Sequence, residues 1–83
     1  MTLRIGVIAD DFTGATDIAG FLVSAGLRTT QLNSPQQAPE NLEADAVVIS
    51  LKTRSIPAQE AIEQSLAACR ILTQLGAEQI IFK

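Results

Sequence analysis

Short, nearly uninterrupted apolar runs alternate along the chain with longer amphipathic segments. Apolar residues dominate 3–9 and 45–51, a pattern typical of parallel strands covered on both faces, and 79–82 is expected to form a further strand. Segment 28–32 is more polar, and its threonines favour a fourth, weaker strand. The order strand, helix, strand, loop, strand, helix, strand predicts an α/β fold. We expect a partial three-layer, Rossmann-like parallel sheet with about four strands and two main helices.

Two segments repeat apolar residues at helical spacing. The first helix is expected to stop at Gly26, which can adopt a left-handed conformation. Its apolar stripe consists of Ile18, Leu22 and Ala25. The second helix is expected to begin at Pro57, with Ser55 as a cap, and to end at Gly76. Its apolar positions are Ile62, Leu66, Cys69 and Leu72. The loop at 33–44 contains two prolines and has room for one helical turn at 39–42.

The length of the chain, 83 residues, is small for a sheet that needs helices on both faces. A composition of 47% hydrophobic and 18% charged residues is typical of one soluble globular unit. The last strand, 79–82, has no helix after it. We therefore expect residues 1–83 to be the N-terminal part of a larger domain, and the exposed last strand to invite self-association.

A net charge of -3 disfavours nucleic acid or an anionic membrane as a partner. The apolar runs are too short to cross a bilayer, and the start lacks a signal-peptide pattern, so a cytoplasmic location is expected by default. Cys69 is the only cysteine, which excludes an intramolecular disulfide and a cysteine-based metal cluster. Its place on the apolar side of a helix predicts a buried structural thiol.

Two adjacent acids, Asp10 and Asp11, directly follow the first strand, where ligands bind in open α/β sheets. Because neighbouring side chains on extended backbone diverge, we expect one acid to face the crevice and the other to hold the turn. A carboxylate there can accept hydrogen bonds from substrate hydroxyls, act as a base or help to hold Mg²⁺. The alternative is a turn and helix cap without chemistry.

The start of the first helix offers a second set of candidates. Thr13 and Gly14 open it, where backbone N–H groups could receive an anionic ligand group. Equally, Thr13 could be a cap and Gly14 a turn residue. Asp17 is expected in the first turn, where it would complement the helix dipole.

The topology suggests a second wall for the crevice. If strand 28–32 lies on one side of strand 3–9 and strand 45–51 on the other, the connections diverge between strands 3–9 and 45–51. Loop 52–55 would then face the acids with Lys52 and Arg54, and Lys83 ends the last strand at the same sheet edge. Arg can bind a carboxylate through two parallel hydrogen bonds while Asp accepts from hydroxyls. Solvated loop charges, or an ion pair with Asp10 or Asp11, would equally explain these residues.

Several catalytic motifs are missing. The chain has neither a phosphate loop of the G-x-x-x-x-G-K-[ST] type nor G-x-G-x-x-G after the first strand, so no nucleotide cradle is recognisable. Without histidine and G-x-S-x-G, a Ser-His-Asp hydrolase site cannot be assembled from it.

Three segments, IADDFTGATD, ISLKTRS and the final IIFK, resemble the N-terminal, sugar-binding domain of the four-carbon acid sugar kinase family. The likeness runs from Leu3 to Lys83. The LKTRS form is most similar to the branch acting on 3-oxo-tetronate, rather than to those acting on D-threonate or D-erythronate.

This resemblance implies an enzyme that uses ATP, with Mg²⁺, to phosphorylate the terminal hydroxyl of a four-carbon sugar acid. Family members have an N-terminal domain for the acid and a C-terminal domain for the nucleotide, so no ATP or metal site is expected within residues 1–83. Asp10 and Asp11 are the candidates for the catalytic base. Carried over to this sequence, the crevice for the small anionic substrate would contain Asp10, Asp11, Thr13, Gly14, Lys52, Thr53, Arg54 and Ser55. The chain alone is expected to be inactive.

Two other functional classes compete with a kinase. A receiver-like signalling module would use the acid pair to bind Mg²⁺ and an Asp on the third strand to accept phosphate. The end of that strand reads Val48-Ile49-Ser50-Leu51-Lys52, which lacks the required carboxylate. A dehalogenase-type phosphatase is less favoured, because its two acids are separated by a spacer residue. The remaining alternative is a structural α/β fragment whose acids only cap a helix.

Overall fold

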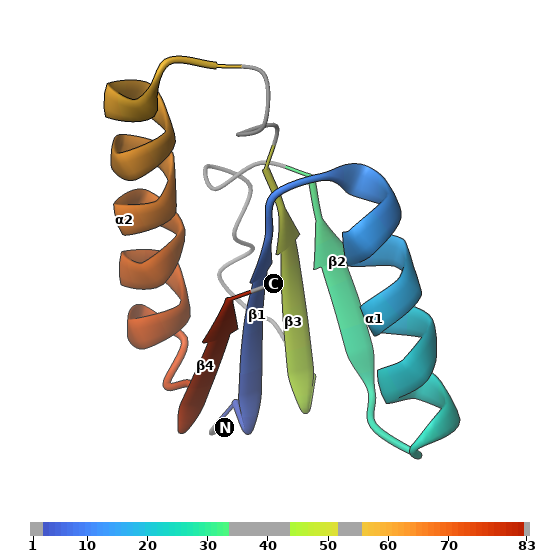
Figure 1. Cartoon of the computed structure of the whole chain (residues 1–83). Coiled ribbons are helices and arrows are strands. Elements are labelled where there is room, and N and C mark those ends of the chain that lie inside the picture. Colours follow the sequence, from blue (N-terminus) through green and yellow to red (C-terminus); the bar gives the residue numbers. More distant parts are fainter. Residues whose placement is uncertain (1–2, 34–43, 52–55, 83) are drawn as a thin grey trace.

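A parallel sheet between two helices forms the protein (Figure 1). The structure is a computed structural model that describes residues 3–33, 44–51 and 56–82. Its elements, in chain order, are β1 (Ile5–Ala9), α1 (Phe12–Ser24), β2 (Thr29–Leu32), β3 (Ala46–Ser50), α2 (Ala58–Gln74) and β4 (Gln79–Phe82). Figure 1 shows α1 and α2 on opposite faces of the sheet. The predicted three-layer α/β fold is therefore confirmed.

The strand order is β2-β3-β1-β4, and all neighbouring strands are parallel. The expectation that segment 28–32 would lie beside the first strand is therefore wrong, because β3 lies between β1 and β2. Burial explains this order. Every residue of β3 is buried, whereas three of the four residues of β2 are only half-buried. An apolar strand is stabilised at the centre of a sheet, and a more polar strand tolerates the edge.

Each helix covers its own side of the sheet. Ala15 and Leu22 of α1 pack in one cluster with β1 and β3 residues that include Val7 and Val48. Ala68 and Leu72 of α2 pack on the other side against the alternate residues, including Ile8 and Ile49. Ala25, which was expected in the α1 stripe, is exposed because it follows the last helical residue.

Glycines allow one close helix–sheet contact and the two helix ends. A Cβ atom on Gly6 would lie 2.7 Å from Cδ1 of Leu72, so the absence of a side chain in β1 lets α2 approach the sheet. Gly26 and Gly76 follow α1 and α2 with φ angles of 90° and 87°. These left-handed residues confirm the predicted helix stops.

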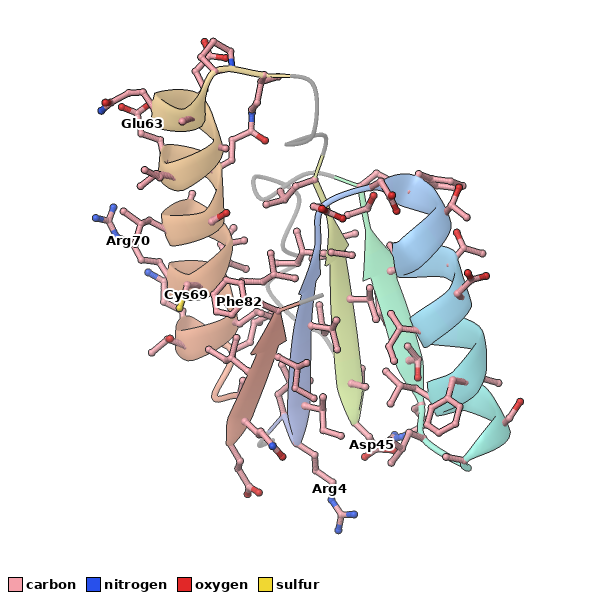
Figure 2. The ribbon with its side chains drawn as sticks, viewed as in Figure 1. Arg4, Asp45, Glu63, Cys69, Arg70 and Phe82 are labelled. Carbon is pink, nitrogen blue, oxygen red and sulfur yellow. The ribbon has the colours of Figure 1, made fainter. Side chains whose placement is uncertain are left out.

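The amino ends of β2 and β3 are joined by Arg28 and Asp45. The Arg28 backbone N–H donates to Oδ2 of Asp45 at 3.0 Å, and its Nε donates to the same oxygen at 3.4 Å. The pKa of Asp45 lies below its ordinary value of 3.8. The largest cause is the hydrogen bond from the Arg28 backbone, and the next is the hydrogen bond from its guanidinium. Arg4 lies at this same end of the sheet (Figure 2) and acts in the same direction.

The apolar stripe expected on α2 is only partly buried. Ile62 is 59% exposed and Leu66 is 54% exposed, while Ala68 and Leu72 make the contact with the sheet. The prediction of one buried face is therefore wrong for Ile62 and Leu66. The edge strand β4 also leaves Ile81 and Phe82 exposed. Within the described residues, these side chains have no layer above them.

Candidate functional site at the carboxyl ends of β1 and β3

The strands β1 and β3 end side by side. Ala9 pairs with Ser50, and the Leu51 N–H donates to the carbonyl oxygen of Ala9 at 2.8 Å, which extends the pairing by one residue. Parallel neighbours lie about 4.8 Å apart, so Asp10 follows β1 next to the point where the chain leaves β3. The helix that follows β1, α1, covers one face of the sheet, and the helix that follows β3, α2, covers the other (Figure 1).

This divergence is a topological switch point, the place where open α/β sheets bind ligands. It lies between β1 and β3, as predicted, although the strand order behind that prediction was wrong. We call residues 9–11 and 50–51 the switch point.

Asp11 caps α1. Its backbone is extended, with φ -149° and ψ 165°, and its Oδ1 accepts a hydrogen bond from the Gly14 N–H at 2.6 Å. Its carbonyl oxygen accepts from the Ala15 N–H at 3.2 Å. Of the two cap residues that the sequence left open, the structure therefore selects the acid, and Thr13 lies inside the helix.

This cap changes which ligand group suits the start of α1. The Gly14 N–H already donates to Asp11, and the cap places a carboxylate at the positive end of the helix dipole. A second negative charge there would be repelled by the first. The arrangement favours a hydroxyl of a ligand at this position over an anionic group.

Asp10 is the acid that the cap does not use. It is half-buried directly after β1. Gly6 and Ile8 face α2, so alternation along the strand directs Asp10 away from α1 and Asp11 toward it. The expected division between an acid that holds the turn and an acid at the crevice is consistent with this geometry, with Asp11 in the first role.

Asp17 does not lie in the first turn of α1. The helix begins at Phe12, and its first turn contains no acidic residue. Because capping by Asp11 starts the helix before Thr13, Asp17 lies beyond the reach of the dipole interaction that the sequence predicted. That expectation is wrong.

The second wall of the predicted crevice lies outside the described residues. This holds for Lys52, Thr53, Arg54 and Ser55, for Lys83, and for the helical turn expected at 39–42. The opposition of acids and bases across the switch point thus stays a prediction. The expected Ser55 cap also stays a prediction. The residue directly before α2, Pro57, provides no side-chain cap.

Ser50 is a candidate that the sequence reasoning missed. It is the last residue of β3 and is only 5% exposed. The signal in the sequence is a polar residue that ends an otherwise apolar strand, two positions before Lys52. Its position beside Ala9 places it within the switch point.

Two shallow hollows occur elsewhere, on the outer surface of α2. One is lined by Leu66, Cys69, Arg70, Thr73 and Gln74, and the other by Ala61, Ile62, Ser65 and Leu66. Arg70 points away from the sheet in Figure 2. Cys69 is half-buried rather than buried, because it packs against the core on one side and lines a hollow on the other. Neither hollow includes an acid, so the switch point is the better candidate for chemistry.

Potential metal ligands are sparse among the described residues. Among them, no group of three His, Cys, Asp or Glu side chains comes together. Mg²⁺ is bound through carboxylate oxygens, and Asp11 already uses one oxygen for its cap. None of the helices in the described ranges is both long and apolar enough to traverse a lipid bilayer.

A parallel sheet with a helix layer on each face and acids at a switch point defines a doubly wound α/β ligand-binding domain. A family model described as a sugar-binding N-terminal domain matches residues 5–83, and the chain belongs to this family.

Relatives and solved structures agree with this assignment. The chain is 62% identical over 81 residues to a 3-oxo-tetronate kinase of Salmonella typhimurium LT2, a match covering 98% of this chain and 19% of the relative. It is 59% identical over 81 residues to a 3-oxo-tetronate kinase of Escherichia coli K12, covering 98% and 21%. The chain thus spans about a fifth of the length of these curated relatives.

Two crystal structures share the fold. One, a Salmonella typhimurium LT2 protein provisionally described as a tRNA synthase, has a TM-score of 0.92 at 60% identity and covers 100% of this chain and 20% of its own. The other, from Haemophilus influenzae, has a TM-score of 0.88 at 58% identity, with 94% and 19% coverage.

Proposed function

We propose that this chain is the sugar-acid-binding portion of an ATP-dependent kinase that phosphorylates the terminal hydroxyl of a four-carbon sugar acid. The favoured substrate is 3-oxo-tetronate, with D-threonate and D-erythronate as alternatives. Membership in a sugar-binding family and the names of the relatives support the substrate class. The observation that carries the proposal is the pairing of Ala9 with Ser50, because it brings the ends of β1 and β3 together beside the acids. A cytoplasmic location is part of the proposal.

The residues of this chain would bind and orient the acid. Asp10 would accept the proton of a substrate hydroxyl and is the candidate base, while Asp11 holds the loop through its cap. Lys52 or Arg54 would bind the substrate carboxylate, which Arg can do through two parallel hydrogen bonds. Thr13, Gly14, Thr53 and Ser55 complete the proposed crevice.

We further propose that residues 1–83 are the N-terminal part of a larger sugar-binding domain, and that nucleotide binding belongs to the remaining length found in the relatives. The exposed side chains of Ile62 and Leu66 on α2, and of Ile81 and Phe82 on the edge strand β4, support this, because exposed large apolar side chains favour a covering layer. In the isolated chain, the open edge of β4 would instead favour self-association, which sedimentation velocity would detect.

A chimera tests the kinase proposal. The matching segment of the Salmonella typhimurium 3-oxo-tetronate kinase would be replaced by this chain, which is 62% identical to it. With ATP and Mg²⁺, the chimera is expected to phosphorylate the sugar acid, and the 83-residue chain alone is expected to show no turnover. A folded chimera without activity would contradict the function, and turnover by the chain alone would contradict the division of labour.

Arg54 provides a sharper test within that chimera. Charged hydrogen bonds contribute about 1.5–3 kcal/mol, so Arg54→Ala is expected to weaken sugar-acid binding by about 10- to 100-fold. Arg70→Ala, on the outer surface of α2, is the matched control and is expected to bind normally. Unchanged affinity in Arg54→Ala would remove Arg54 from the site.

The other candidate functions have weaker support. A receiver-like module needs a phosphate-accepting carboxylate at the end of β3, where the described residues are Ser50 and Leu51. A stable aspartyl-phosphate after treatment with a small phosphodonor would revive it. The hypothesis of a purely structural fragment is consistent with the Asp11 cap. It predicts that no sugar acid binds. The net charge of -3 disfavours tRNA as a ligand.

A further inference from the structure

Ser50 is the buried polar side chain among the residues that the structure describes. It ends β3, pairs with Ala9 and lies where the connections from β1 and β3 diverge. Alternation along β3 places it on the side of Ala46 and Val48, which belong to the cluster packed against α1. Ser50 thus lies at the carboxyl end of β3, on the face where α1 begins.

The Ser50 hydroxyl is not used within the described structure. Across residues 3–33, 44–51 and 56–82, its side chain makes no hydrogen bond. In the same ranges, every side-chain nitrogen or oxygen that is fully shielded from solvent has a partner. The hydroxyl must therefore reach solvent through the 5% of Ser50 that is exposed. Because the preceding residues of β3 are covered on both faces, that opening lies toward the switch point.

The residues near Ser50 indicate which kind of ligand group would hydrogen-bond with its hydroxyl. Asp11 places a carboxylate on the same side of the sheet, and its Oδ1 accepts from the Gly14 N–H. An anionic ligand group would be repelled there, whereas a ligand hydroxyl can donate its proton to a carboxylate. That hydroxyl oxygen keeps lone pairs, which a serine O–H can satisfy and a carboxylate cannot.

We propose that the Ser50 hydroxyl donates a hydrogen bond to a hydroxyl oxygen of the bound sugar acid, and so contributes to recognition of a polyhydroxy substrate. This inference rests on the proposed function. It adds a residue of β3 itself to a crevice otherwise assigned to loops. Because the hydroxyl has no internal partner and reaches solvent, it is available to hydrogen-bond with a ligand at the switch point.

The test is an NMR titration of the 83-residue chain with D-erythronate, D-threonate and 3-oxo-tetronate. Ser50→Ala removes the hydroxyl, and Ser50→Cys keeps the volume but leaves only a weak donor. Both are expected to weaken binding by about 3- to 10-fold, the effect of one hydrogen bond. Their melting temperatures should equal or exceed that of the unsubstituted chain, because the lost group has no internal partner. Ser24→Ala, at the exposed last residue of α1, is the matched control and should bind normally.

A ligand series locates the contact. With 3,4-dihydroxybutanoate and 2,4-dihydroxybutanoate, each lacking one hydroxyl, the effect of Ser50→Ala should disappear for one of the two. Equal affinity of Ser50→Ala for every acid would refute the role of Ser50 while leaving the proposed function intact. Weaker binding together with a lower melting temperature in both variants would show a structural role and also overturn the inference. If the unsubstituted chain binds none of the acids, the proposed function itself fails, and the role of Ser50 fails with it.

Discussion

The Asp11 carboxylate accepts a hydrogen bond from the Gly14 backbone N–H at 2.6 Å, which separates the roles of two acids that are adjacent in the sequence. Asp11 starts α1 and fixes the path of the chain out of β1. Asp10, one residue earlier, is not part of this cap and is the acid proposed to contact the ligand. The first two predictions follow from this separation.

Removing the cap should cost stability. Asp11→Ala is expected to lower the free energy of unfolding by about 1 kcal/mol, because an N–H of the first turn loses its acceptor. Asp11→Asn keeps an acceptor oxygen and should lose only a few tenths of that amount. Urea denaturation followed by circular dichroism measures both. An Asn variant as unstable as the Ala variant would mean that the charge, rather than the hydrogen bond, stabilises α1.

Asp10 should matter for catalysis more than for folding. In the chimera, Asp10→Asn is expected to reduce kcat by about 10²- to 10⁴-fold, the usual effect of removing a general base. Thermal denaturation of the variant measures any separate effect of the substitution on folding. Steady-state kinetics with the sugar acid varied would separate kcat from KM. A loss confined to KM would assign Asp10 to binding alone.

Two leucines of α2 should behave differently although they occupy the same predicted stripe. Leu72 is fully buried and Leu66 is 54% exposed. In the 83-residue chain, Leu72→Ala is expected to cost about 2–5 kcal/mol and Leu66→Ala less than about 1 kcal/mol. If a further layer covers α2 in the chimera, Leu66→Ala should cost more there than in the isolated chain. Equal losses for both leucines in the isolated chain would contradict the orientation of α2.

The Arg28–Asp45 pair predicts a dependence of stability on pH. The folded-state pKa of Asp45 lies below 3.8, so between the two pKa values the unfolded chain binds more protons. The contribution of Asp45 is therefore full above the ordinary pKa and is lost as the pH falls through the lowered one. Unfolding free energies of the unsubstituted chain and Asp45→Asn should converge with acidification below about pH 4. Glu63→Gln, on α2, serves as the control, and a gap that widens in acid would contradict the assignment.

Much of the fold could be predicted from the sequence, because apolar runs such as that ending at Ala9 require cover on both faces. The position of β2 in the sheet could not be predicted, because its weakly apolar pattern does not determine which strand it pairs with. Spacing alone also placed Leu66 and Leu72 on one face, whereas the sheet contacts a narrower strip of α2. At the site, Ser50 was missed because a serine at a strand end has no distinctive pattern. Its burial became visible only with the register of β1 and β3.

The central claim is that a sugar acid binds where β1 and β3 end together. The most direct measurement is a map of backbone amide shifts in the ¹⁵N-labelled 83-residue chain during titration with a four-carbon sugar acid. Shifts are expected to concentrate at residues 10–14 and 50–55, with little change at Arg28 and Asp45 at the opposite end of the sheet. Saturable shifts centred instead on the outer surface of α2, or at those amino ends, would contradict the account.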